Sequence, residues 1–339
     1  MVYTLLRNQL KVSRIAMGCW GISPIDFTWG GTEKATALKT LYTAYDLGIN
    51  FFDTAEMYGD GGSESLLGCI WDTIPRDQVT IASKVSQAHL NSRDLIQACE
   101  NSLRRLKSDY IDLYQIHWPN PNIPLEETLK GIETLIRDGK IRYMGLSNFG
   151  VSYLKEFEQI GKIDLPLSNQ LNYSLLFRAI EYQLLPTCQR YGLPILCYSP
   201  LAQGLLSGKI RNLSEVPVTR ARTRLFAPHR PYSRHHGPNL ELLLQETLHH
   251  LLTLSEEVGI PLGKLALSWI LSQQGIASVI VGFRSPEHVH ALLPLVEDPL
   301  SDCILHQLQT ITLPLKVALG DNCDIWEDHS RLERPSHLS

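Results

Sequence analysis

The sequence predicts an α/β fold of the (β/α)8 TIM-barrel type, in which eight parallel strands close into a barrel inside a ring of helices. Short apolar runs alternate with longer segments of helical periodicity, which is the pattern of repeated strand–helix units. Three successive runs end in or near Asp53, Lys84 and His117, and the carboxyl ends of parallel strands meet at one mouth of a barrel. At 339 residues the chain fits one such domain, residues 1–339, with a core at about 12–295.

The elements follow in a regular order. Residues 2–6 and 11–13 flank Asn8 and Gln9, which predicts an N-terminal β-hairpin that closes the barrel floor. The predicted barrel strands are residues 15–18, 49–53, 79–84, 111–117, 143–147, 167–170, 194–198 and 278–282. Leu38, Leu41 and Tyr45 recur at helical spacing, so the segment between the first two strands is an amphipathic helix whose apolar face covers the sheet.

Glycines and one proline mark helix ends. Gly48, Gly139 and Gly192 each stand where a helical pattern stops and a strand begins, a position that favours positive φ. Before the eighth strand, residues 240–258 and 261–272 predict two helices, with Pro261 in the first turn of the second. A minimal barrel needs only one helix there.

Two segments interrupt the alternation. Residues 200–239 are too long for an ordinary connection, and long loops at the C-terminal face of a barrel are usually functional. This loop is locally basic, so it fits either a phosphate-rich cofactor or a solvated loop with incidental charge. Its arginines are Arg220, Arg222, Arg224, Arg230 and Arg234. The tail, residues 313–339, is expected either to fold back over the barrel mouth or to fray.

Composition narrows the class of protein. The 31 Lys and Arg against 35 Asp and Glu give a net charge of -4, which argues against nucleic acid or a membrane surface as a partner. The seven cysteines are scattered without a CxxC pair, which predicts reduced thiols and a cytoplasmic location. No apolar run reaches about 18 residues and no signal peptide is evident, so we expect no membrane span. We also expect no metal site.

Four polar residues could perform proton chemistry together. Tyr58 follows Asp53 by five residues, and a tyrosine of pKa about 10 needs a nearby cation to favour its anion. Lys84 could be that cation, Asp53 could hold Lys84 in place, and His117 could hydrogen-bond a carbonyl oxygen. Taken singly, the aspartate fits a turn cap, the lysine a solvated charge and the histidine a buried structural group. Their joint placement at three strand ends favours one site.

Five motifs resemble those of the aldo-keto reductase family, in its bacterial-type branch. The motifs are GINFFDTAEMYG at residues 48–59, SK at 83–84, DLYQIHW at 112–118, GLSNF at 145–149 and YSPLAQG at 198–204. The resemblance covers residues 3–295. It implies a barrel that binds an extended nicotinamide dinucleotide without a Rossmann domain, and the absence of a GxGxxG after a strand agrees with this.

The resemblance also implies the chemistry. Tyr58 would be the general acid in carbonyl reduction, Lys84 would lower its pKa, and Asp53 would orient Lys84. His117 would position the carbonyl group, and the hydride would come from the nicotinamide. Trp20 and Trp118 would wall the substrate pocket beside Tyr58 and His117, although packing at the barrel rim also suits large aromatic residues.

Cofactor contacts are carried over by the same matches. Ser147, Asn148 and Gln170 would bind the carboxamide, and Tyr198 would stack on the nicotinamide ring. Ser199, Leu201 and Gly204 would line the pyrophosphate, with the glycine allowing close backbone approach. The full expected set is Trp20, Asp53, Ser147, Asn148, Gln170, Tyr198, Ser199, Leu201, Gly204, Gly282, Arg284 and His288.

The adenine end departs from much of the family. Gly282 stands where many members have a lysine, and His288 stands where an arginine meets the 2′-phosphate. Arg284 is therefore the remaining strong cation at this end. On the adenine side, Leu292 stands where an asparagine is common in the family. The expected cofactor is NADPH, with NADH not excluded.

Two other functions remain open from the sequence. Relatives of this barrel serve as potassium-channel β subunits, which keep the cofactor and act as binding partners. A lyase that forms a Schiff base through Lys84 is a further alternative, since a lysine at a strand end can be made nucleophilic. The substrate is expected to be a small carbonyl compound: small aldehydes, semialdehydes, 2-oxoaldehydes and quinone-like carbonyls all fit. The oligomeric state is open.

Overall fold

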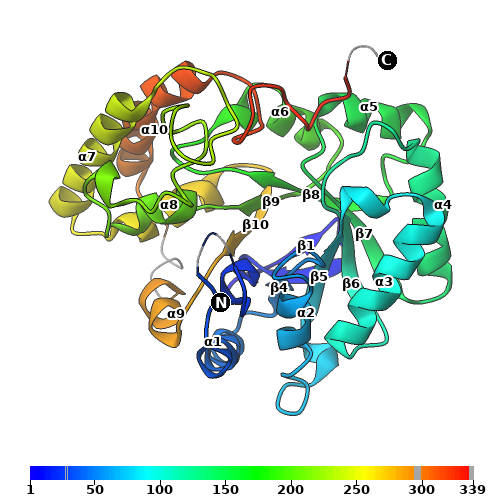
Figure 1. Ribbon diagram of the computed structural model, residues 1–339. Coiled ribbons are helices and arrows are strands. Elements are labelled where there is room, and N and C mark those ends of the chain that lie inside the picture. The colour runs from blue at the N-terminus through cyan, green and yellow to red at the C-terminus, as the bar shows by residue number, and fades with distance from the viewer. Residues whose placement is uncertain (27, 29, 294–298, 336–339) are drawn as a thin grey trace.

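The fold is a closed barrel of eight parallel strands, as predicted (Figure 1). The computed structural model describes residues 1–26, 28, 30–293 and 299–335. The strands neighbour one another in the order β10-β3-β4-β5-β6-β7-β8-β9. Their bounds are β3 (Ile15–Gly18), β4 (Phe51–Asp53), β5 (Thr80–Val85), β6 (Ile111–Ile116), β7 (Ile141–Ser147), β8 (Pro166–Asn172), β9 (Ile195–Tyr198) and β10 (Ile276–Val281). Every predicted strand overlaps an observed one.

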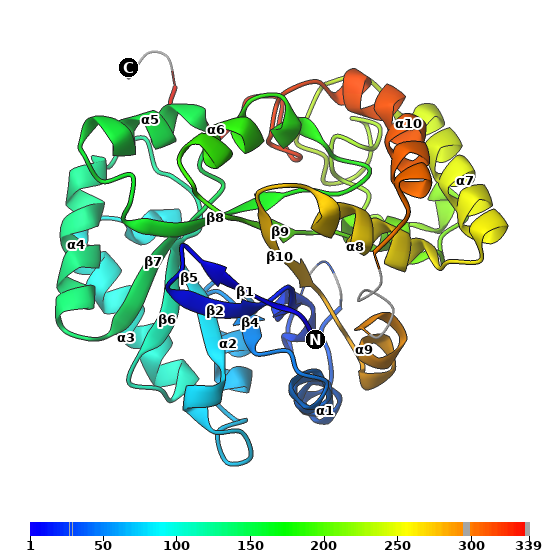
Figure 2. The ribbon, with the colours of Figure 1, turned by 180° about the vertical axis from the view of Figure 1, so that it is seen from behind.

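Most helices surround the barrel, and two of them lie outside this ring on one side. They are α1 (Lys34–Asp46), α2 (Gly62–Leu67), α3 (Ser92–Leu106), α4 (Leu125–Arg137), α5 (Val151–Gln159), α6 (Leu184–Arg190), α7 (Glu241–Val258), α8 (Leu262–Ser272), α9 (Pro286–Leu292) and α10 (Asp302–Leu319). The two helices predicted before the last strand are confirmed as α7 and α8. Figures 1 and 2 show α7 and α10 side by side, outside the ring around the barrel. No described helix is long and apolar enough to cross a membrane.

The N-terminal hairpin covers one end of the barrel, as predicted (Figure 2). Strands β1 (Tyr3–Leu6) and β2 (Leu10–Ser13) pair antiparallel, and Arg7 and Asn8 turn the chain with positive φ. Leu6, Leu10 and Val12 are buried against apolar residues of the barrel interior. The hairpin therefore closes the end opposite the strand carboxyl termini.

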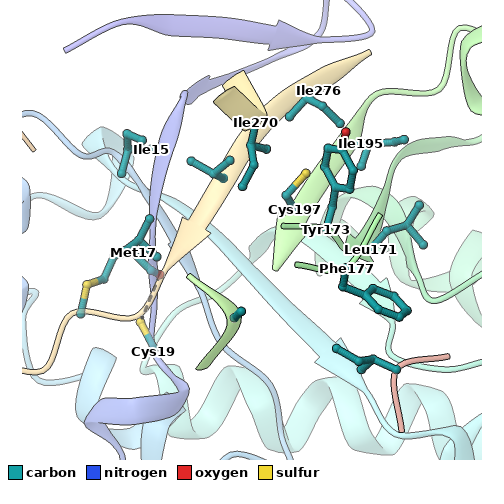
Figure 3. Close-up of a cluster of buried hydrophobic side chains, with 14 of the residues drawn as sticks. Ile15, Met17, Cys19, Leu171, Tyr173, Phe177, Ile195, Cys197, Ile270 and Ile276 are labelled. Carbon is teal, nitrogen blue, oxygen red and sulfur yellow. Dashed lines mark hydrogen bonds between the residues drawn. The ribbon is translucent and has the colours of Figure 1, made fainter. Parts of the chain in front are cut away.

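Strand alternation sorts side chains between the barrel interior and the helices. Ala16 of β3 belongs to the interior cluster, whereas Ile15 and Met17 pack in the outer core. Figure 3 shows Ile15 and Met17 with outward residues of β8, β9 and β10, beside Ile270 of α8. On β5 the same alternation turns Ala82, and hence Lys84, inward. The polar residues near the strand ends therefore point into the barrel mouth.

The long loop is packed against the protein body. Within residues 200–239, Ala221, Leu225 and Phe226 are buried, and two short 3₁₀ helices form: η5 (Ala202–Ser207) and η6 (Leu213–Glu215). Arg224 joins the loop to the C-terminal segment, since its backbone N–H donates to the Ile325 carbonyl at 2.8 Å. The loop is thus not simply a solvated connection.

The C-terminal segment begins later than predicted. Residues 313–319 are not tail but the end of α10, which continues through Pro314. Beyond it the chain folds back: Leu332 is buried, and both carboxylate oxygens of Glu333 accept backbone N–H groups at the start of α5 at 2.8 Å. The core boundary near 295 and the tail end at 336–339 lie outside the described residues.

Candidate active site

The four predicted catalytic residues meet at the mouth of the barrel. Asp53 ends β4, Lys84 lies in β5, His117 directly follows β6, and Tyr58 lies in the turn after β4. The Lys84 ammonium donates to Asp53 Oδ1 at 2.5 Å, to the Thr54 carbonyl at 2.9 Å and to the Tyr58 hydroxyl at 3.1 Å. The Tyr58 ring meets the His117 ring edge-on, with centroids 5.8 Å apart. The side chains of Lys84, Tyr58 and His117 therefore lie next to one another.

Burial and charge set the protonation states of this group. Burial lowers the pKa of Lys84, but Asp53 and Tyr58 outweigh burial and raise this pKa above its ordinary value. Burial raises the pKa of Tyr58, and Lys84 lowers it by less, so the phenol keeps its proton at neutral pH. Burial, assisted by Lys84, holds the pKa of His117 well below its usual range. The site therefore contains an ammonium, a neutral phenol and a neutral imidazole.

The second oxygen of Asp53 has two amide partners. Oδ2 accepts from Gln170 Nε2 at 2.7 Å and from Gln115 Nε2 at 3.1 Å. Sequence reasoning did not select Gln115. Its signal was present, because Gln115 is a polar residue two positions before His117 on the inward side of β6.

A cavity of about 810 Å³ opens over this group. Every predicted site residue lines it except Lys84, which is fully buried beneath Tyr58. The lining predicted residues are Trp20, Asp53, Tyr58, His117, Trp118, Ser147, Asn148, Gln170, Tyr198, Ser199, Leu201, Gly204, Gly282, Arg284 and His288. The structure therefore brings together residues that are up to 268 positions apart in the chain, from Trp20 to His288.

Polar groups between β7 and β9 are joined in a chain. Tyr198 donates its hydroxyl to Asn148 Oδ1 at 3.0 Å, and Asn148 Nδ2 donates to Ser147 Oγ and to the His117 carbonyl, each at 3.1 Å. Asn148 has a φ of 60°, a left-handed conformation that asparagine tolerates better than most residues. These hydrogen bonds fix the polar wall next to Tyr58.

Cations gather at the other end of the cavity. Lys209 and Arg220 from the long loop line it together with Arg284 and His288. Lys209 Nζ lies 3.4 Å from His288 Nε2, and burial followed by Lys209 lowers the pKa of that imidazole. Sequence reasoning did not select Lys209, and it named Arg220 only as one of the loop arginines that could meet a phosphate-rich cofactor. This end of the cavity is suited to an anionic group such as a phosphate.

Aromatic residues line the end of the cavity that contains Tyr58. Trp20 stacks on Tyr58 with ring centroids 6.0 Å apart. The tail adds Trp326 and Arg331 to the lining, and the Arg331 guanidinium lies 4.2 Å from the centre of the Trp118 ring. Among the described residues, no group of three or more His, Cys, Asp or Glu could hold a metal ion.

Comparisons with known proteins agree on one family. A model described as the aldo/keto reductase family matches residues 14–312. The chain is 34% identical over 307 residues to aldo-keto reductase YhdN of Bacillus subtilis, covering 86% of this chain and 88% of the relative. It is 30% identical over 318 residues to the NADH-specific methylglyoxal reductase of Escherichia coli, covering 87% and 93%.

A solved structure gives the same result. An aldo-keto reductase from Klebsiella pneumoniae in complex with NADPH is 31% identical to this chain and has a TM-score of 0.72. The match covers 92% of this chain and 96% of that one.

Proposed function

The chain belongs to the aldo/keto reductase family, and from this premise we propose that Asp53, Tyr58, Lys84 and His117 reduce an aldehyde or ketone to an alcohol with a nicotinamide cofactor. The observation that carries the proposal is the Tyr58 hydroxyl held 3.1 Å from a buried lysine ammonium that is itself paired with Asp53. A neutral acid next to a fixed cation is what protonation of a developing alkoxide requires.

The residues of the cavity fit a nicotinamide dinucleotide. Tyr198 offers an aromatic face, and Gly204, with a φ of 95°, brings the backbone close to the cavity. Arg284 and its neighbouring cations would hold the phosphate at the adenine end. We propose NADPH as the preferred cofactor, because a similar structure is in complex with NADPH, and NADH as the alternative, because a relative is named NADH-specific. When bound, the nicotinamide supplies the hydride.

The proton steps follow from the protonation states. Tyr58 donates its hydroxyl proton to the substrate oxygen as negative charge develops there. Lys84, held charged by Asp53, then stabilises the tyrosinate. His117 is neutral, so it can donate one N–H to the carbonyl oxygen and orient it without competing as an acid. Trp20 and Trp118 would exclude water from this end of the cavity.

We propose methylglyoxal, a 2-oxoaldehyde, as the first substrate to test. Two relatives from Escherichia coli carry that activity in their names. The aromatic wall and the neutral imidazole suit a small, uncharged carbonyl compound. The proposed location is the cytoplasm, which fits seven free cysteines.

A Schiff-base role for Lys84 conflicts with the geometry. All three ammonium hydrogens have acceptors, at Asp53, Thr54 and Tyr58, and the pKa of Lys84 is raised. A nucleophilic lysine needs a lowered pKa. The four residues do not distinguish the reductase from a purely cofactor-binding role, because potassium-channel β subunits can keep the same set; turnover of an aldehyde distinguishes the two.

Fluorescence titration with NADPH and then NADH, followed by an activity assay with methylglyoxal, tests the proposal. Quenching of Trp20 or Trp118 by NADPH and consumption of NADPH with the aldehyde are expected. Cofactor binding without turnover of methylglyoxal or any other small aldehyde would support the binding role instead.

A further inference from the structure

Three buried side chains form a closed hydrogen-bonded ring beneath the cavity: Asp53, Gln115 and Gln170. Gln115 Nε2 and Gln170 Nε2 donate to Asp53 Oδ2 at 3.1 Å and 2.7 Å, and Gln170 Nε2 also donates to Gln115 Oε1 at 3.3 Å. Gln115 is completely inaccessible to solvent, whereas Gln170 also lines the cavity. The ring therefore connects the interior of the barrel with the side of the cavity proposed to bind the cofactor.

The chemistry of the ring fixes the direction of each amide. A carboxylate only accepts hydrogen bonds, so both glutamines must turn nitrogen toward Asp53. Gln170 then uses one N–H on Asp53 and the other on the Gln115 carbonyl oxygen. The amide oxygen of Gln170, Oε1, takes no part in the ring and is available to accept a hydrogen bond. A carboxamide N–H of the nicotinamide is the donor that it suits.

Packing holds Gln115 in its place. Gly145 of β7 lies directly opposite Gln115 of β6. A Cβ atom on Gly145 would lie 2.8 Å from Gln115 Cγ, which is too close for a real contact, and 3.1 Å from Leu113 Cδ1, which is tighter than most real contacts. The space for the Gln115 side chain therefore depends on a glycine in the neighbouring strand.

We propose that Gln115 is a positioning residue that couples the proton donor to cofactor binding. Through Asp53 it keeps Lys84 charged and directed at Tyr58, and through Gln170 it presents an acceptor to the nicotinamide carboxamide. The inference rests on the proposed reductase function. Without Gln115 the terminal torsion of Gln170, which is soft, loses a partner that defines its orientation. Loss of Gln115 therefore lowers both the rate of the chemical step and the affinity for the cofactor.

Gln115→Met tests the proposal, because it keeps the length of the side chain and removes both polar atoms. With NADPH and methylglyoxal, we expect kcat to fall about tenfold to a hundredfold, as for loss of a hydrogen bond to a charged group. The NADPH Kd should rise about threefold to tenfold for loss of the ordered acceptor. An unchanged kcat and Kd in the folded variant overturns the proposal.

Gln115→Glu separates positioning from packing. An ionised carboxylate in place of the amide would repel Asp53, whereas a protonated carboxyl group can donate to Oδ2 as the amide does. Activity of this variant should therefore recover as pH falls, a limb absent from the wild-type profile. A loss that does not depend on pH would mean that Gln115 acts by packing alone, and would overturn the proposal.

Gly145→Ala provides a second route, because it retains Gln115 and crowds it. It should lower kcat and weaken NADPH binding in the same direction, and full activity would contradict the proposal. Tyr114→Phe is the matched control, since Tyr114 neighbours Gln115 on β6 but packs in the outer core. Tyr58→Phe tests the underlying function, and the reductase mechanism fails if this variant stays active. If Tyr58→Phe loses activity while Gln115→Met keeps it, only the inference about Gln115 is refuted.

Discussion

Lys84→Met should remove most of the reductase activity while leaving the cavity in place. The Nζ to hydroxyl distance of 3.1 Å corresponds to about 5 kcal/mol of attraction between an ammonium and a tyrosinate, at an effective dielectric constant of about 20. That energy is gained only when Tyr58 has given up its proton, so it lowers the barrier. Its loss predicts a fall in kcat of up to about 10⁴-fold.

The same substitution should destabilise the fold, because Asp53 is left as a buried carboxylate without its cation. Removing one partner of a buried pair costs about 3–5 kcal/mol, and the two glutamine donors to Oδ2 place this case near the lower value. Chemical denaturation measures this free energy of unfolding. Activity must therefore be assayed under conditions where circular dichroism shows the variant to be folded.

Lys162→Met is the matched control for charge and size. Lys162 pairs with Glu133 at 2.8 Å on the surface, and both side chains are about half exposed. Its loss should cost less than about 1 kcal/mol and leave kcat unchanged. The reasoning is refuted if folded Lys84→Met binds NADPH and keeps activity within about tenfold of wild type.

Three other contacts lead to predictions of their own. Arg284→Ala should weaken NADPH by about tenfold and NADH by less, as measured by fluorescence titration, and equal weakening would show that Arg284 does not read the 2′-phosphate. The pKa of His117 is lowered by burial and then by Lys84, so the unfolded chain binds a proton at a pH where the folded protein does not. The free energy of unfolding should therefore fall as pH drops below about 6.5, by at most about 1.4 kcal/mol per pH unit. Urea titrations of His117→Gln should lack this contribution. Glu333→Ala should cost about 1–2 kcal/mol in urea unfolding, since it removes the acceptor at the start of α5, and no change in stability would mean that the tail is not anchored there.

The pH dependence of the stability that Lys84 contributes is opposite in sign to that expected for His117. Its pKa is raised in the folded state, so this contribution is complete below the ordinary lysine value of 10.5 and is lost as pH rises through the folded pKa. Alkaline unfolding of wild type and Lys84→Met should therefore converge above that range.

Strand periodicity was sufficient to predict the barrel and to bring Asp53, Lys84 and His117 to one mouth. Alternation on a strand is rigid, so a residue at a strand end has a defined direction. Gln115 was missed although the same rule applies to it, because no reactive side chain drew attention to a residue within the strand. Its importance becomes visible only through its contact with Asp53, which lies on β4, two strands away in the barrel.

The loop and tail were the least predictable parts. Ser199, Ala202 and Gln203 adopt positive φ without being glycines, so the local residues carry no turn signal there. Lys209 consequently could not be placed beside His288. Likewise, Pro314 suggests the end of a helix, yet α10 continues through it and is packed against α7. In each case long-range packing overrides the local preference.

The central claim is that Tyr58 donates the proton, and the single-turnover rate of Tyr58→Phe with bound NADPH and methylglyoxal tests it most directly. We predict a rate lower by about 10²–10⁴-fold with an NADPH Kd close to wild type, because the ring remains and only the hydroxyl is lost. A near wild-type rate would contradict the account and assign the proton to another donor.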